Sequence, residues 1–127
     1  MFSLKSHDRL KSKKDIELLF NEGKQAYFFP FKLMYILRDL DEDRVPLKFA
    51  ISVPKKKLKK AVDRNLIKRR CREAYRLNNS ALKDLLTSHN KQLILMFIYL
   101  NHEIKEYITI EKSIKKHLNA LLSEISA

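Results

Sequence analysis

The sequence is poor in the residues that interrupt or cross-link a chain. It contains one glycine, three prolines and one cysteine among 127 residues. A single cysteine excludes an internal disulfide bond and is typical of a reducing compartment. We also find no internal repeat and no stretch with the composition of a linker. These absences predict one domain over residues 1–127, large enough to bury its own hydrophobic core.

Long hydrophobic segments are missing as well. The longest fully apolar run, Leu93–Leu100, has eight residues, whereas a membrane-spanning helix needs about 20. The opening residues, MFSLKSHDRLKSKK, lack the apolar centre of a secretory signal. The sequence therefore predicts a cytoplasmic protein without a membrane partner, in which residues 1–8 are flexible.

Acidic residues are few relative to basic ones, and the imbalance is local. The chain has 27 Lys and Arg against 15 Asp and Glu, a net charge of +12. Residues 55–76, KKKLKKAVDRNLIKRRCREAYR, contain eleven of the basic residues and only two acids, so this segment carries +9 of the total. Such a concentration favours a polyanionic partner, either a nucleic acid or an acidic membrane surface.

The first periodic segment predicts a short helix over residues 13–22. Ser12 is placed to cap its N-terminus, and Gly23 is placed to end it in the left-handed C′ conformation. Two alternating segments, 31–38 and 47–53, then predict strands, and the acidic residues 39–46 between them predict a hairpin loop. On the first strand, we expect the side that carries Lys32, Met34 and Ile36 to line a wetter surface such as a cleft.

The rest of the chain predicts two long helices and one buried strand. A helical pattern runs over 59–77, with one or two further turns around 81–86. The apolar run 92–100 is typical of a strand that is covered on both faces. Thr109 can cap a last helix over 110–125. The predicted fold is an α/β (α+β) two-layer sandwich with one small sheet of about four strands and three helices.

Helical spacing gathers much of the positive charge on one side of the second helix. Cations recur at every fourth residue: Arg64, Lys68, Arg72 and Arg76. Asn65 and Arg69 form a parallel row beside them. Like charges at this spacing repel each other, and an external polyanion would offset the repulsion by neutralising the row and releasing counterions. The pattern therefore predicts nucleic-acid binding.

Three other interpretations of the basic helix remain. It could be a solvated charged face, although its sign imbalance is unusual for one. A membrane-surface helix would carry bulky apolar residues opposite the charges, and Ile67, Cys71 and Ala74 are small for that role. A DNA-recognition helix would need fewer cations and a helix closely preceding it.

We predict no catalytic residue and no metal site in this chain. The histidines, His7, His89, His102 and His117, are scattered, and we expect His117 at the surface. Cys71 has no neighbour in sequence of the kind that binds a metal with it.

The segment SVPKKKLKKAVDRNLIKRRCREAYR resembles the signature of the bacterial ribonuclease P protein subunit, S-V-S-K-K-x-G-x-A-V-x-R-N-R-x-K-R-x-x-R-[EQ]-[AS]-[FY]. Upstream, RLKSKKDIELLFNEGK is similar to the opening of the same family, R-L-x-x-x-x-[DE]-F-x-x-[VL]-[FY]-x-x-G. The resemblance covers residues 9–125. It departs at Leu66, where the family has a second Arg, and before the helix, where the glycine of the family is absent.

The resemblance implies a fold with a left-handed βαβ crossover and a role in an endoribonuclease. In this family the ribonucleoprotein removes the 5′ leader from precursor tRNA. Catalysis lies in the RNA subunit, with Mg²⁺ bound mainly through RNA and without an organic cofactor. The implied partners are the catalytic RNA and the leader, and we expect the protein to be monomeric without RNA. A non-catalytic RNA-binding or ribosome-assembly protein remains the alternative.

The resemblance also implies two sets of site residues. The RNA-binding residues would be Lys55, Lys56, Lys60, Arg64, Asn65, Lys68, Arg69, Arg72 and Arg76. The leader-binding cleft would be formed by Ile16, Phe20, Lys32 and Met34.

Overall fold

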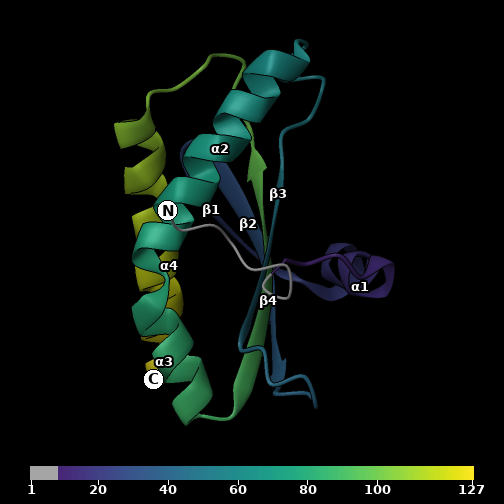
Figure 1. The fold of residues 1–127 in the computed structure, drawn as a ribbon, viewed down its shortest axis with the longest axis vertical. Helices are drawn as coiled ribbons and strands as arrows, with labels where there is room; N and C mark the ends of the chain where they lie inside the picture. The colour runs from purple at the N-terminus through teal and green to yellow at the C-terminus, as the bar shows by residue number, and fades with distance from the viewer. Residues whose placement is uncertain (1–8) are drawn as a thin grey trace.

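The computed structural model describes residues 9–127, which form four helices and four strands (Figure 1). The helices are α1 (Lys13–Glu22), α2 (Ala61–Asn78), α3 (Ser80–Ser88) and α4 (Tyr107–Ser126). The strands are β1 (Lys24–Phe28), β2 (Phe31–Asp39), β3 (Leu47–Ser52) and β4 (Lys91–Tyr99). The expectation of flexibility concerns residues 1–8, which lie outside this range.

The four strands form one mixed sheet in the order β1-β2-β4-β3. β2 pairs antiparallel with both β1 and β4, whereas β3 and β4 are parallel. The predicted hairpin between β2 and β3 is therefore wrong, because β4 lies between these strands. β4 is almost continuously buried, and a strand that is apolar on both faces is most stable at the centre of a sheet. The left-handed sense of the crossover from β3 through α2 and α3 to β4 stays a prediction.

Helices cover both faces of the sheet. Figure 1 shows α2, α3 and α4 on one side and α1 alone on the other. The larger hydrophobic cluster lies on the three-helix side and includes Phe31, Leu33 and Phe97. A smaller cluster under α1 contains Leu10, Leu19, Met34, Ile94 and Met96. The α+β class and the single four-stranded sheet are confirmed, and α1 adds a partial third layer.

Several element boundaries differ from the prediction. β1 was not predicted, because KQAYF does not alternate clearly between apolar and polar residues. The turns expected around 81–86 form a separate helix, α3, which raises the number of helices from the predicted three to four. Asn79 separates α3 from the end of α2. α4 begins two residues before Thr109, at Tyr107, so the expected cap is wrong.

The predicted first helix is confirmed at both ends. The Asp15 amide donates to Ser12 Oγ at 3.3 Å, as expected for an N-cap. Gly23, however, has φ −67° and ψ 142°, which is extended backbone rather than the predicted left-handed conformation. Its lack of a side chain matters for a steric reason, because an added Cβ would lie 2.4 Å from the carbonyl oxygen of Leu19.

His117 is fully buried, so its predicted surface position is wrong. The imidazole Nε2 lies 2.9 Å from the carbonyl oxygen of Phe31, and the ring makes edge contacts with Phe28 and Phe97. Because α4 packs on the sheet, this residue ties the helix to the β1–β2 turn. Among residues 9–127, no helix is long and apolar enough to cross a membrane.

Candidate nucleic-acid interface

One side of α2 is buried, and this determines which of its side chains are available to a partner. Ile67, Cys71, Ala74 and Tyr75 are completely buried in the larger cluster. Burial also raises the pKa of the Cys71 thiol well above its ordinary value, which makes the thiol unreactive. The basic side chains of α2 lie on the other sides of the helix, away from the hydrophobic core.

Three cations and one amide form the open part of this surface. The side chains of Lys68, Arg69, Arg72 and Asn65 make no hydrogen bond or ion pair with any other residue in the range 9–127. Arg69 and Arg72 are exposed, and Lys68 is half-buried. We call these four residues the open α2 patch. Guanidinium groups without internal partners present planar, forked donors that match phosphate oxygens.

The other arginines of α2 are engaged within the protein. Arg64 donates through one guanidinium nitrogen to the carbonyl oxygens of Leu58 and Lys59, at 3.0 and 2.7 Å. Arg76 forms an ion pair with Glu73 one turn earlier. The predicted row of four cations therefore divides, and its two end members have structural partners. Whether Arg64 and Arg76 also contact RNA stays a prediction.

Arg70 differs from both groups. Its guanidinium donates to the Lys105 carbonyl oxygen at 2.6 Å, in the loop between β4 and α4. This contact explains why Arg70 does not belong to the open patch although it lies beside Arg69 in sequence.

The loop before α2 extends the positive surface. Lys55, Lys56 and Lys60 are exposed, as their predicted role requires. The amides of Lys57 and Leu58 donate to the Pro54 carbonyl oxygen and close a turn. This turn and the Arg64 contacts hold the loop against the start of α2, where Lys60 supplies no side-chain cap.

The predicted leader-binding residues are split between the surface and the core. Phe20 on α1 is 57% exposed, Ile16 is half-buried against the smaller cluster, and Lys32 is half-buried on β2. Met34 is only 2% exposed and belongs to the smaller cluster. The expectation that Met34 lies on a wet surface is therefore wrong, because α1 covers that part of the sheet.

The strand register reveals an open row beside α1. Tyr27 pairs with Lys32, Lys32 pairs with Ile98, and Ile98 pairs with Ser52. Lys32, Ile98 and Ser52 each lie two residues from Met34, Met96 and Ala50 respectively, which contact or belong to the cluster under α1, and residues two apart in a strand share a face. The row Tyr27–Lys32–Ile98–Ser52 consequently projects from the α1 side of the sheet. Tyr27 is 54% exposed, and the other three are half-buried.

Sequence reasoning missed Tyr27, Ile98 and Ser52 as candidate site residues. The alternation of β2 identified Lys32, but without β1 nothing placed Tyr27 next to it. An exposed aromatic side chain beside a lysine is a common single-stranded RNA contact, since bases stack on the ring while the cation attracts the backbone.

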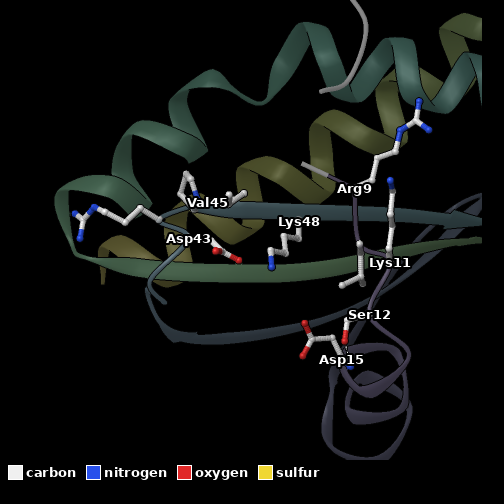
Figure 2. Close-up of a pocket in the computed structure, with 10 residues that line it drawn as sticks. Arg9, Lys11, Ser12, Asp15, Asp43, Val45 and Lys48 are labelled. Atoms are coloured by element: carbon white, nitrogen blue, oxygen red, sulfur yellow. Dashed lines mark hydrogen bonds between the residues drawn. The ribbon is translucent and has the colours of Figure 1, made fainter. Parts of the chain in front are cut away.

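Two hollows lie along the outer edge of β3. The larger, of about 630 Å³, is lined by residues that precede or begin α1 and by residues around the start of β3: Arg9, Leu10, Lys11, Ser12, Asp15, Asp43, Arg44, Val45, Pro46 and Lys48. Figure 2 shows Ser12 and Asp15 on the α1 side of this hollow and Lys48 projecting from β3. The smaller, of about 270 Å³, is lined by Arg9, Leu10, Lys11, Phe49, Ala50, Ile51 and Arg72.

Backbone and side-chain contacts hold the chain in place around these hollows. The Leu10 amide donates to the Phe49 carbonyl oxygen at 2.9 Å, so the segment before α1 lies along β3. Asp15 accepts two hydrogen bonds from Arg38, which hold the pKa of its carboxyl below the ordinary value. Because Asp15 is already neutralised by Arg38, it does not cancel the charge of Arg9 and Lys11.

Comparison with known proteins assigns this chain to a family. The family profile described as Ribonuclease P matches residues 4–125. The ribonuclease P protein component of Porphyromonas gingivalis strain W83 is 35% identical over 118 residues, which cover 92% of this chain and 85% of that protein. The chain belongs to the ribonuclease P protein family.

Solved structures of ribonuclease P proteins have the same fold. The Thermotoga maritima protein matches with a TM-score of 0.67 and 25% identity, covering 88% of this chain and 96% of the other. The Staphylococcus aureus protein matches with a TM-score of 0.66 and 22% identity, covering 91% and 94%. Membership of the ribonuclease P family implies tRNA processing, a role in an endoribonuclease complex and an RNA partner.

Proposed function

We propose that this chain is the protein subunit of a ribonuclease P ribonucleoprotein that binds the catalytic RNA and the 5′ leader of precursor tRNA. It assists the Mg²⁺-dependent removal of the leader, and the bond is broken in a centre formed by the RNA. The observation that carries the proposal is the open α2 patch, whose cations have no partner within residues 9–127 and lie inside the sequence motif that resembles the family signature. Location in the cytoplasm and a monomeric free protein belong to the same proposal.

Catalytic RNA is the proposed partner of α2 and of the loop before it. Arg69 and Arg72 can each form forked contacts with phosphates, while Lys68 adds a point charge. Asn65 can donate to or accept from a sugar or base edge. The exposed lysines of the preceding loop, Lys55, Lys56 and Lys60, extend the contact toward the open row.

The leader is the proposed partner of α1 and the open row. A single strand can stack its bases on Phe20 and Tyr27 while Lys32 attracts a phosphate. Ile16 and Met34 would support this surface from beneath, since Ile16 packs against the cluster in which Met34 is buried. The open row thus supplies a stacking contact that buried Met34 does not provide.

Mg²⁺ would be held through RNA. Within residues 9–127, no group of three His, Cys, Asp or Glu side chains has an arrangement that could hold a metal ion. The chain would act by neutralising phosphates near the metal-binding RNA, which reduces repulsion between the two RNA molecules.

Reconstitution of cleavage tests the proposal. Purified protein added to the cognate catalytic RNA and a 5′-labelled precursor tRNA should raise the rate of leader release at low Mg²⁺. The variant Lys68→Ala/Arg69→Ala should lose most of this effect, and the control Lys112→Ala/Lys116→Ala, which removes two exposed cations from α4, should retain it. Absence of stimulation by folded wild-type protein, together with preferential binding to ribosomal RNA, would support the ribosome-assembly alternative instead.

A further inference from the structure

The two hollows beside β3 adjoin each other. Both are lined by Arg9, Leu10 and Lys11. We call the combined hollow the edge groove, defined by Arg9–Lys11, Lys48 and Ala50. Apart from Arg72, which also belongs to the open α2 patch, none of the lining residues is part of the patch or of the proposed leader surface, so the role of the groove is unassigned.

The edge groove is continuous with both proposed RNA-binding surfaces. Lys48, Ala50 and Ser52 alternate along β3 and therefore project from the same face of the sheet. Lys48 lines the larger hollow, Ala50 the smaller one, and Ser52 ends the open row. Arg72 of the open α2 patch also lines the smaller hollow. A single-stranded RNA that lies across the open row and continues past β3 would therefore enter the edge groove.

The charges in the groove suit a phosphate backbone. Arg9 and Lys11 are exposed and have no ion pair with any residue from 9 to 127. Lys48 is weakly paired, with its Nζ 3.8 Å from a carboxylate oxygen of Asp41. Figure 2 shows Arg9 and Lys11 on the segment that leads into α1, with side chains that extend away from the end of Lys48; all three residues line the larger hollow.

The apolar walls indicate a single strand rather than a duplex. Of the apolar residues that line the two hollows, Pro46 and Ile51 are half-buried and offer surface to a ligand, whereas Leu10, Val45 and Phe49 are at most 7% exposed. Unstacked bases gain from such surfaces while cations follow the backbone. Double-stranded RNA keeps its bases stacked and is recognised mainly by shape and backbone, so it would leave these walls unused.

We propose that the edge groove binds the distal part of the 5′ leader, beyond the nucleotides that lie on the open row. This inference rests on the proposed function, because the leader is the single strand that function supplies. It assigns Arg9 and Lys11 as phosphate contacts that act only on precursors whose leader is long enough to reach them.

A series of precursors with increasing leader length tests the inference in the reconstituted holoenzyme. For long leaders, Arg9→Ala/Lys11→Ala should weaken precursor binding and reduce the log–log salt slope by about 1.4, or about 0.7 for each lost contact with a single strand. Binding of short-leader precursors and mature tRNA should stay at the wild-type level, as should binding of the protein to catalytic RNA. The control Lys112→Ala/Lys116→Ala should match wild type with every leader.

Site-directed cross-linking provides a readout that does not depend on affinity. Cys71 is fully buried, so a photoreactive thiol reagent should label Lys11→Cys selectively. We expect cross-links to distal leader nucleotides. Cross-links to catalytic RNA alone would overturn the inference. So would a double variant that binds mature tRNA as weakly as it binds long-leader precursors. If wild-type protein fails to stimulate cleavage, the proposed function itself has failed, and that result is recognisable before any variant is examined.

Discussion

At the scale of single residues, position decides what each arginine of α2 does. Arg69 has no partner within residues 9–127, Arg70 donates to a loop carbonyl, and Arg64 holds the loop before the helix. These residues are chemically identical and close in sequence. Their roles differ because the helix turns each side chain by about 100° relative to the previous one, toward solvent or toward a neighbouring loop.

Neighbouring arginines should therefore respond differently to alanine substitution. Arg69→Ala should weaken RNA binding and lower the salt slope by about 0.7 to 0.9, with unfolding free energy within about 0.5 kcal/mol of wild type. Arg70→Ala should lower the unfolding free energy by about 1.5 kcal/mol, because it loses a charge-assisted hydrogen bond to Lys105. Denaturant titration and RNA binding at several salt concentrations measure both effects. A reversed pattern would assign Arg69 to the fold and Arg70 to the interface.

His117 should make stability depend on pH. A carbonyl oxygen only accepts, so Nε2 carries the proton toward Phe31, and among the described residues the buried Nδ1 finds no hydrogen-bond partner. Burial lowers the pKa of His117 below its ordinary value of 6.5. The unfolded chain then binds a proton more readily than the folded one, so stability is complete above about pH 6.5. It should fall as pH drops through 6.5 toward the folded-state pKa.

The melting temperature of wild type and His117→Gln across pH 5 to 8 checks this linkage, since Gln retains a donor for Phe31 but does not titrate. The variant should be less stable at pH 8, with a flatter profile between about pH 6.5 and 5. Parallel profiles would show that another group causes the pH dependence.

At the scale of elements, the junction of α1 and β1 positions the leader surface. α1 ends at Glu22 and β1 begins at Lys24, so one residue turns the chain from helix to strand. The Gly23 amide donates to the Leu19 carbonyl oxygen at 2.9 Å, and a Cβ at Gly23 would collide with the same oxygen. The close approach of the backbone therefore determines the residue at this junction.

Gly23→Ala should shift α1 relative to the sheet. The backbone must move to avoid the collision, which should lower the unfolding free energy by about 1 to 3 kcal/mol, as at other overpacked sites. Because Phe20 moves with α1, binding of leader-containing precursor should weaken while binding of catalytic RNA to α2 is retained. Thermal unfolding and the two binding assays test this. Wild-type stability in the variant would show that the junction accommodates a side chain without movement.

Substitution of a buried residue under α1 and of an exposed residue beside it should have different effects. Met34→Ala should lower the unfolding free energy by about 2 to 5 kcal/mol, because it opens a cavity under α1. Tyr27→Ala should leave stability nearly unchanged and weaken leader binding by about 1 to 3 kcal/mol, the value of one stacked base. Precursor and mature tRNA affinities, measured beside denaturant curves, distinguish the outcomes. Equal loss of mature tRNA binding by Tyr27→Ala would contradict a leader contact.

At the scale of the whole molecule, the uneven charge distribution should control association with RNA. The net charge is +12, and the segment 55–76 carries most of it. The three cations of the open α2 patch form no ion pair with any of the described residues, 9–127, so they can bind phosphates without breaking one. A plot of the logarithm of the association constant against the logarithm of the salt concentration should therefore have a slope of about −2 or steeper. Filter binding between low and physiological salt measures it, and a slope near zero would exclude phosphate contacts as the main source of affinity.

The sequence by itself determined the family, the basic helix and most of the elements, because these depend on local spacing and on a contiguous motif. The helical repeat places Lys68 and Arg72 on one side of α2 whatever surrounds them, and the apolar run of β4 requires burial on both faces. Only the tertiary structure decided that β4 separates β2 from β3, that Met34 and His117 are buried, and that Arg70 binds a loop carbonyl. Each of these outcomes depends on a segment distant in sequence, and local periodicity contains no information about which distant segment packs against a given face.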